Sequence, residues 1–297
     1  MTPGGTHGLG VMPMPSGPQE PDERHDDLGL GRDRGALLTG GLLIAIAVLA
    51  WSAVILQAGG MQGANTTDPK AGLLMTAEGG RRWPVFADAA VFLTSWVVMM
   101  AAMMLPSATP MIMLYDAVRR NFFWTGEKGI PASLFALMYL ALWLAFGAPV
   151  WAAGVLLDLT ARNHSALSSL LPYALVLILI AAGAYQFSRW KRVCRRVCQN
   201  PLSFLIRHWR NGYLGTLKVA CEHAAYCVGC CWALMIVLVA AGAMALHWVL
   251  LIAAAVFAEK IFPLGEWTSR IVGVALIALG ILVAVHPVLA VSLRGGM

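Results

Sequence analysis

The strongest constraint on this chain is a series of apolar runs, each long enough to cross a lipid bilayer as a helix. A membrane-spanning helix needs about 20 consecutive, mainly apolar residues. We predict seven spans, over residues 35–56, 86–115, 130–156, 170–187, 219–241, 246–262 and 271–289. The predicted fold class is therefore all-α, a polytopic transmembrane helix bundle of about seven spans.

The composition excludes several classes of protein. Charged residues make up 12% of the chain and hydrophobic residues 59%, with a mean hydropathy of +0.71. A soluble domain usually contains about 25% charged residues. These values exclude a soluble enzyme, a disordered protein and a nucleic-acid-binding module. The net charge of +6 does not indicate nucleic-acid binding, because the basic residues lie between the apolar runs.

The first 34 residues differ from the rest of the chain. They are rich in Gly and Pro, and they contain six acidic residues against three arginines. No basic and then apolar segment typical of a cleaved signal peptide lies near the start. We expect a disordered acidic tail over residues 1–34 and a helical membrane domain over residues 35–297.

The loop charges predict the orientation. Of the 21 Lys and Arg residues, 16 fall in the N-terminal tail and every second loop, and 5 fall in the other connections. Basic loops stay on the cytoplasmic side, so the N-terminus is expected there and the C-terminus opposite. Eight basic residues lie between the fourth and fifth spans. This 4–5 loop either only sets the topology or also contacts anionic lipid headgroups.

Cysteines provide the first candidate site. All six lie between residues 194 and 231, in a Cys-x-x-x-Cys pair (Cys194, Cys198) and a Cys-x-x-Cys-Cys run (Cys227, Cys230, Cys231). At about 100° per residue, a helix places His223 and the second group on one face, with Cys221 pointing away. Thiolates select Cu(I) or Zn(II). The alternatives are buried, packing cysteines or disulfides, and the predicted cytoplasmic side disfavours disulfides.

Methionines provide a second candidate site. Four of them form two i,i+4 pairs, Met99 with Met103 and Met100 with Met104. Thioethers favour Cu(I), although Met also fills gaps in helix cores. Pro106 and Pro110 are expected to kink or end this helix.

An ionisable pair, Glu259-Lys260, lies near the end of the sixth span. Ionisable residues inside a span are functional candidates. The alternative is a helix-end pair in which Lys260 extends to the membrane surface. The predicted topology places this pair, both cysteine groups and the methionines toward the cytoplasmic leaflet. We expect a converging site there.

The same motifs carry a family resemblance over roughly residues 85–265. They are Trp96, Met99, the run 102–107 and Pro110; Lys191, Cys194, Cys198 and Pro201; the run 226–235; and Glu259-Lys260. With them the chain resembles a bacterial domain-of-unknown-function family of predicted metal-binding integral membrane proteins. It departs at Arg195 and Ala224, where the family leads us to expect an apolar residue and a glycine. The resemblance implies metal binding.

The prediction that follows is a multi-pass protein of the bacterial inner membrane that binds Cu(I), or Zn(II), in the cytoplasmic half of its bundle. Its role would be metal handling, transport or delivery. The metal ligands are predicted among Cys227, Cys230, Cys231, Cys194, Cys198 and His223, then Met99, Met100, Met103 and Met104, with Glu259 balancing charge or relaying protons. Expected partners are the lipid bilayer and a metal donor or acceptor protein, and no nucleic acid.

Two alternatives remain open at this point. A membrane thiol–disulfide oxidoreductase would cycle its paired cysteines between thiol and disulfide. A structural or assembly subunit would use them only for packing. No catalytic residues are predicted, and the pattern favours a binding protein over an enzyme.

Overall fold

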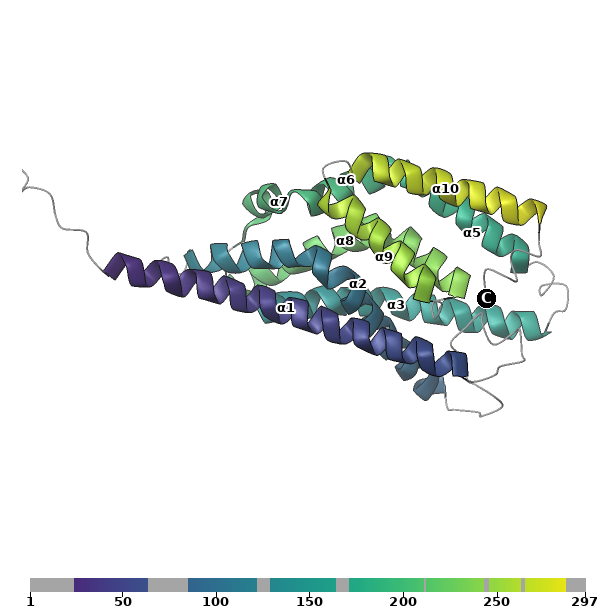
Figure 1. The fold of residues 1–297 in the computed structure, drawn as a ribbon, viewed down its shortest axis with the longest axis horizontal. Coiled ribbons are helices and arrows are strands. Elements are labelled where there is room, and N and C mark those ends of the chain that lie inside the picture. The colour runs from purple at the N-terminus through teal and green to yellow at the C-terminus, as the bar shows by residue number, and fades with distance from the viewer. Residues whose placement is uncertain are drawn as a thin grey trace, which may run out of the picture.

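The computed structural model describes residues 24–63, 85–121, 129–163, 171–210, 212–242, 246–262 and 265–286. Within these ranges the chain is helical and contains no strand. The longer helices run roughly along the long axis of an elongated bundle (Figure 1). The predicted all-α class is confirmed.

Within the described ranges, five helices contain segments long and apolar enough to cross a membrane. They are α1 (Arg24–Gly63), α2 (Val85–Asn121), α3 (Ala132–Asn163), α8 (Gly212–Gly242) and α10 (Gly265–Val285). A sixth candidate is the pair formed by α5 (Leu171–Gln186) and α6 (Arg189–Gln199), which meet at a bend of 62°. The remaining helices are α7 (Pro201–His208) and α9 (Leu246–Ile261). Because α9 has 16 residues and a span needs about 20, the count of seven stays a prediction.

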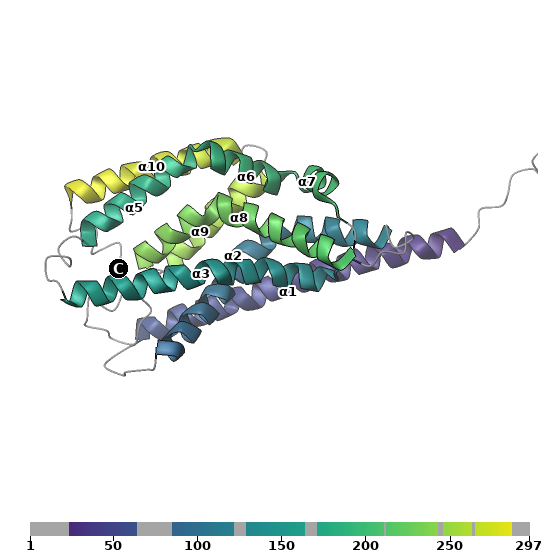
Figure 2. The same ribbon diagram turned by 180° about the vertical axis from the view of Figure 1, so that it is seen from behind.

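Two helices differ in detail from the sequence expectation. Helix α1 begins at Arg24, inside the segment expected to be a disordered tail, and residues 1–23 lie outside the described part of the chain. Helix α2 continues through Pro106 and Pro110, so these prolines do not end it. It changes direction along its length (Figures 1 and 2), as the loss of backbone donors at proline leads one to expect.

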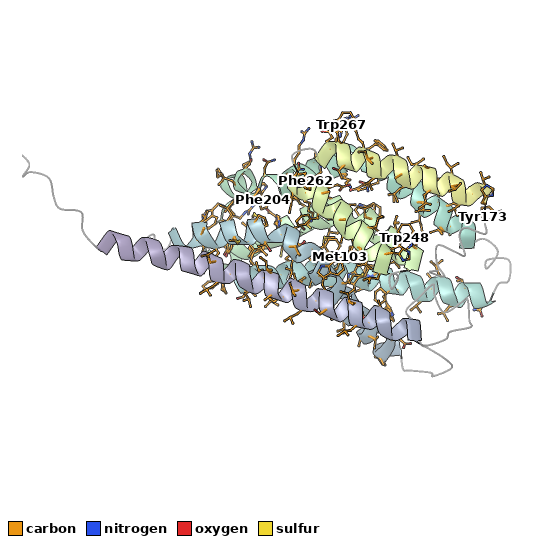
Figure 3. All side chains as sticks on the ribbon, in the orientation of Figure 1. Met103, Tyr173, Phe204, Trp248, Phe262 and Trp267 are labelled. Carbon is orange, nitrogen blue, oxygen red and sulfur yellow. The ribbon has the colours of Figure 1, made fainter. Side chains whose placement is uncertain are left out.

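Helices α5 and α10 pack side by side through glycine (Figure 1). A Cβ atom at Gly183 would lie 2.8 Å from the carbonyl oxygen of Gly273 and 2.6 Å from Ile277 Cγ1. Small residues allow such close approach, which is how helices associate in lipid, where no hydrophobic effect drives them together. Trp267 and Tyr173 are exposed at opposite ends of this pair (Figure 3), as in the aromatic belts of membrane proteins.

One end of the bundle gathers α6, α7 and the ends of several longer helices. The Ile130 N–H, before α3, donates to Thr216 Oγ1 of α8 at 3.1 Å. At the end of α9, the Glu259 carbonyl accepts from Gln199 Nε2 of α6 at 2.7 Å. Arg195 of α6 lies 3.8 Å from Glu266 at the start of α10. We call this the α7 end; the last described residues of α10 lie at the opposite end (Figure 1).

Candidate metal centre

The short helix α6 lies against α8 and α9 because its sequence gives it two different faces. The Ser188 hydroxyl caps its first turn by accepting from the Lys191 N–H at 3.1 Å. Lys191 and Arg195, four residues apart, are buried and face acidic groups of α9 and α10. Cys198 lies one further turn along and faces α8. Lys191, Arg195 and Cys198 follow an i, i+4, i+7 spacing, so they lie along one side of α6, and this side faces α8, α9 and the start of α10.

Three cysteine sulfurs converge where α6 crosses α8. The Sγ atoms of Cys198, Cys227 and Cys230 all lie within 4.8 Å of one another, and we call them the sulfur triad. Cys198 Sγ is 4.0 Å from Cys230 Sγ. Cys231 Sγ is 3.1 Å from Cys230 Sγ. Cys227, Cys230 and Cys231 are 1–3% exposed, and all six cysteines are free thiols.

Polar groups from three other helices surround Cys227. Lys260 of α9 places its Nζ 2.9 Å from Cys227 Sγ and 3.2 Å from Ser107 Oγ of α2. The hydroxyl of Tyr139, on α3, is 2.9 Å from the same sulfur. Lys260 is only 7% exposed, so the idea that it extends to the surface is wrong. A buried ammonium beside a sulfur favours the thiolate form, which is the metal-binding form of cysteine.

Glu259 is buried but faces away from the sulfur triad. Its Oε2 lies 2.7 Å from Lys191 Nζ of α6, and both side chains are almost fully buried. Lys191 also donates to Gln186 Oε1, and the second Glu259 oxygen has no hydrogen-bond partner within the described part of the chain. Glu259 therefore ties α6 to α9, beside Lys260, rather than contacting a cysteine.

The predicted methionines lie on α2, in the core of the bundle. Met99, Met100, Met103 and Met104 are all buried, and Met103 lies in the middle of the bundle (Figure 3). Of these four methionines, Met104 has a contact with a residue next to the triad: its Sδ lies 3.8 Å from Lys260 Nζ. The same ammonium contacts Cys227 Sγ, so Met104 and Cys227 share Lys260 as a neighbour.

The remaining predicted residues lie around the triad. Cys194 is half-buried against α8 at Gly229, where an added Cβ would lie 2.9 Å from its Sγ. His223 is buried one turn before Cys227. Cys221 is only partly buried, as expected for the opposite side of α8.

Two groups at this site are not apparent from the sequence. Tyr139 and Ser107 contact Cys227 and Lys260, but each looks like an ordinary residue within an apolar run. Tyr139 lies in an otherwise apolar stretch of the third predicted span, which is the one signal that could have pointed to it. The sequence marks Lys260 as a candidate, but its direction toward α2 and α8 depends on how α9 packs.

The sequence that contains this site matches the model of a known protein family. A family model described as "PpoB2: Copper chaperone" matches residues 93–283. That range contains the sulfur triad, Lys260 and Tyr139. No curated protein and no solved structure matches the chain.

Proposed function

Because the chain belongs to the PpoB2 copper chaperone family, we propose that it binds Cu(I) at the sulfur triad and passes the ion to a partner protein. The observation that carries this proposal is the approach of three cysteine sulfurs to within 4.8 Å in a buried site. Copper is the cargo here. Thiolate sulfur is the ligand type that selects this soft ion over Mg²⁺ or Ca²⁺.

The number of sulfurs favours Cu(I) over Zn(II). Structural Zn(II) sites are almost always tetrahedral with four protein ligands. In the part of the chain that the structure describes, the group of metal-ligating atoms at this site has three members, Cys198, Cys227 and Cys230. Cys231 Sγ lies 3.1 Å from Cys230 Sγ but outside this group, so the closed set supplies three of the four ligands that a structural Zn(II) site takes.

A positive charge beside the triad would make a Cu(I)–thiolate site less unfavourable to bury. Three thiolates and Cu(I) would leave an excess of negative charge inside the bundle. Lys260, whose ammonium lies 2.9 Å from Cys227 Sγ, offsets part of it. A buried charge without such a partner would be strongly unfavourable in this setting.

Metal content gives the direct test. The full-length protein, purified in detergent with its thiols reduced, should retain about one Cu(I) per chain, as expected for one closed thiolate set. It should prefer Cu(I) to Zn(II) when both compete with a chelator. Redox-dependent alkylation of Cys198 and Cys230 without bound metal would instead support a thiol–disulfide oxidoreductase. Absence of both would leave only a packing role for the cysteines.

We also propose an orientation in the bacterial inner membrane, in which the α7 end faces the cytoplasm. The support is the excess of Lys and Arg in the loops that meet there. A reporter enzyme active only outside the cytoplasm should work when fused after Met297 and stay silent when inserted at Asn200. The reverse pattern would overturn the orientation.

The outer surface of α6 and α7 suits contact with anionic lipid headgroups. Trp190, Val193 and Ile206 are exposed apolar residues, and Arg196 and Arg207 are exposed beside them. Apolar and cationic side chains on one surface are typical of helices that lie in the membrane interface. We propose that this surface rests on the cytoplasmic leaflet and leaves the α7 end accessible to a copper donor or acceptor.

A further inference from the structure

His223 lies one turn before Cys227 on the same side of α8. Four residues along a helix correspond to a rise of about 6 Å. Tyr139 of α3 touches both residues: its ring is stacked on the His223 ring, with centroids 6.2 Å apart, and its hydroxyl is 2.9 Å from Cys227 Sγ. The imidazole and the sulfur therefore both face α3.

The surroundings of His223 leave one of its nitrogens unused. The side chain is 3% exposed and lies among the aromatic rings of Phe135, Tyr139 and Phe204. Its Nδ1 is buried and has no hydrogen-bond partner among the residues that the structure describes. Leaving a buried polar group unpaired costs about 1–3 kcal/mol, so a purely structural ring here would be better as phenylalanine. An unpaired, buried imidazole nitrogen points to a ligand that is present for part of the time.

The position of His223 connects the triad with the α7 end. Phe204 of α7 lies on the outer side of His223, with ring centroids 5.7 Å apart. His208, half-buried at the end of α7, stacks on Phe204 at 4.4 Å. An ion entering beneath α7 would therefore meet His223 before it reaches Cys227.

We propose that His223 is a relay ligand that binds Cu(I) transiently as the ion passes between the α7 end and the sulfur triad. This inference rests on the proposed function. Imidazole is a good ligand for copper, but His223 is not part of the closed ligand group formed by Cys198, Cys227 and Cys230. His223 is therefore suited to bind the ion transiently during transfer rather than to hold it at equilibrium.

Each step of the relay exchanges one lone-pair donor on copper for another. During loading, the His223 nitrogen replaces a thiolate of the carrier, and a cysteine thiolate then replaces the nitrogen. The thiol proton that a cysteine loses is matched by the proton that the released carrier thiolate takes up. Copper remains Cu(I), and no electron is transferred.

The test compares the rate of loading with the affinity at equilibrium. The reduced full-length protein in detergent is mixed with the Cu(I)–glutathione complex, and the ultraviolet absorption of Cu(I)–thiolate bonds is followed by stopped flow. His223→Phe keeps an aromatic ring but removes the nitrogens, and should load about tenfold more slowly, in the range known for lost metal-site partners. Its copper stoichiometry and its Kd from chelator competition should match those of the wild type.

Two further variants separate coordination from packing. His223→Met restores a soft donor and should recover most of the loading rate. His247→Phe changes an exposed histidine at the start of α9, away from the α7 end, and should load at the wild-type rate.

Three results would overturn the relay. Loading of His223→Phe at the wild-type rate would show that copper takes another route. Loss of equilibrium affinity in His223→Phe would make His223 a resident ligand. Equally slow loading by His223→Met would assign the effect to packing. If wild-type protein binds no Cu(I), the proposed function itself fails, whereas intact binding with any of the three results rejects the relay alone.

Discussion

Replacing Cys230 with serine is expected to abolish Cu(I) retention while the protein still folds and accumulates. Cys230 Sγ belongs to the triad and also donates to the Cys227 carbonyl at 3.2 Å. A serine hydroxyl can make the same bond to the preceding turn, so the structural cost should be about 1 kcal/mol. Removing an outer-shell partner lowers metal affinity by about 10–100-fold. Removing one of the three sulfur ligands should lower the Cu(I) affinity by more than that.

The control for this experiment is Cys221→Ser on the same helix. Cys221 is a partly buried thiol that is not in the triad, so its variant should retain copper like the wild type. Cys198→Ser should behave like Cys230→Ser, because both sulfurs belong to the triad, although they come from different helices. Copper content and chelator competition on the purified variants provide the measurement. Equal retention by all three variants would assign the cysteines to packing and reject the metal site.

Replacing Lys191 with methionine is expected to cause a large loss of stability. Methionine keeps much of the side-chain volume but leaves Glu259 buried without the ammonium now 2.7 Å from its Oε2. Breaking a buried ion pair by removing one partner costs about 3–5 kcal/mol, a large share of the free energy of unfolding of a typical protein. Denaturant unfolding in detergent, followed by circular dichroism, measures the change.

Two comparisons separate the contribution of the ion pair to stability from the effect of its burial. The double variant Lys191→Met/Glu259→Met should recover most of the lost stability, because apolar replacement of a whole buried pair is often neutral or stabilising. Arg270→Met breaks the half-exposed ion pair with Glu266 and should cost less than about 1 kcal/mol. If Lys191→Met is no more destabilised than Arg270→Met, the buried pair does not hold α6 against α9.

Much of the fold could be predicted from local patterns. An apolar run of span length has few folded forms in a membrane, since each backbone N–H and C=O must find a partner within its own helix. The runs therefore predicted the helical bundle, although the apolar pattern alone does not fix where a helix begins, as the start of α1 at Arg24 shows. Helical spacing likewise predicted that Cys227, Cys230 and Cys231 are neighbours, because that relation lies within one helix.

Contacts between helices depended on the tertiary structure. The crossing of α6 and α8 brings Cys198 to Cys230 and leaves Cys194 against Gly229, although both cysteines had the same sequence signal. The packing of α9 likewise turns Glu259 toward Lys191 and Lys260 toward Cys227, although the two residues are adjacent. Periodicity records which way a side chain points around its own helix axis, and it carries no information about the neighbouring helix. The sequence alone thus determined an all-α bundle with a thiol-rich helix face, while helix packing decided which thiols meet and which cation lies beside them.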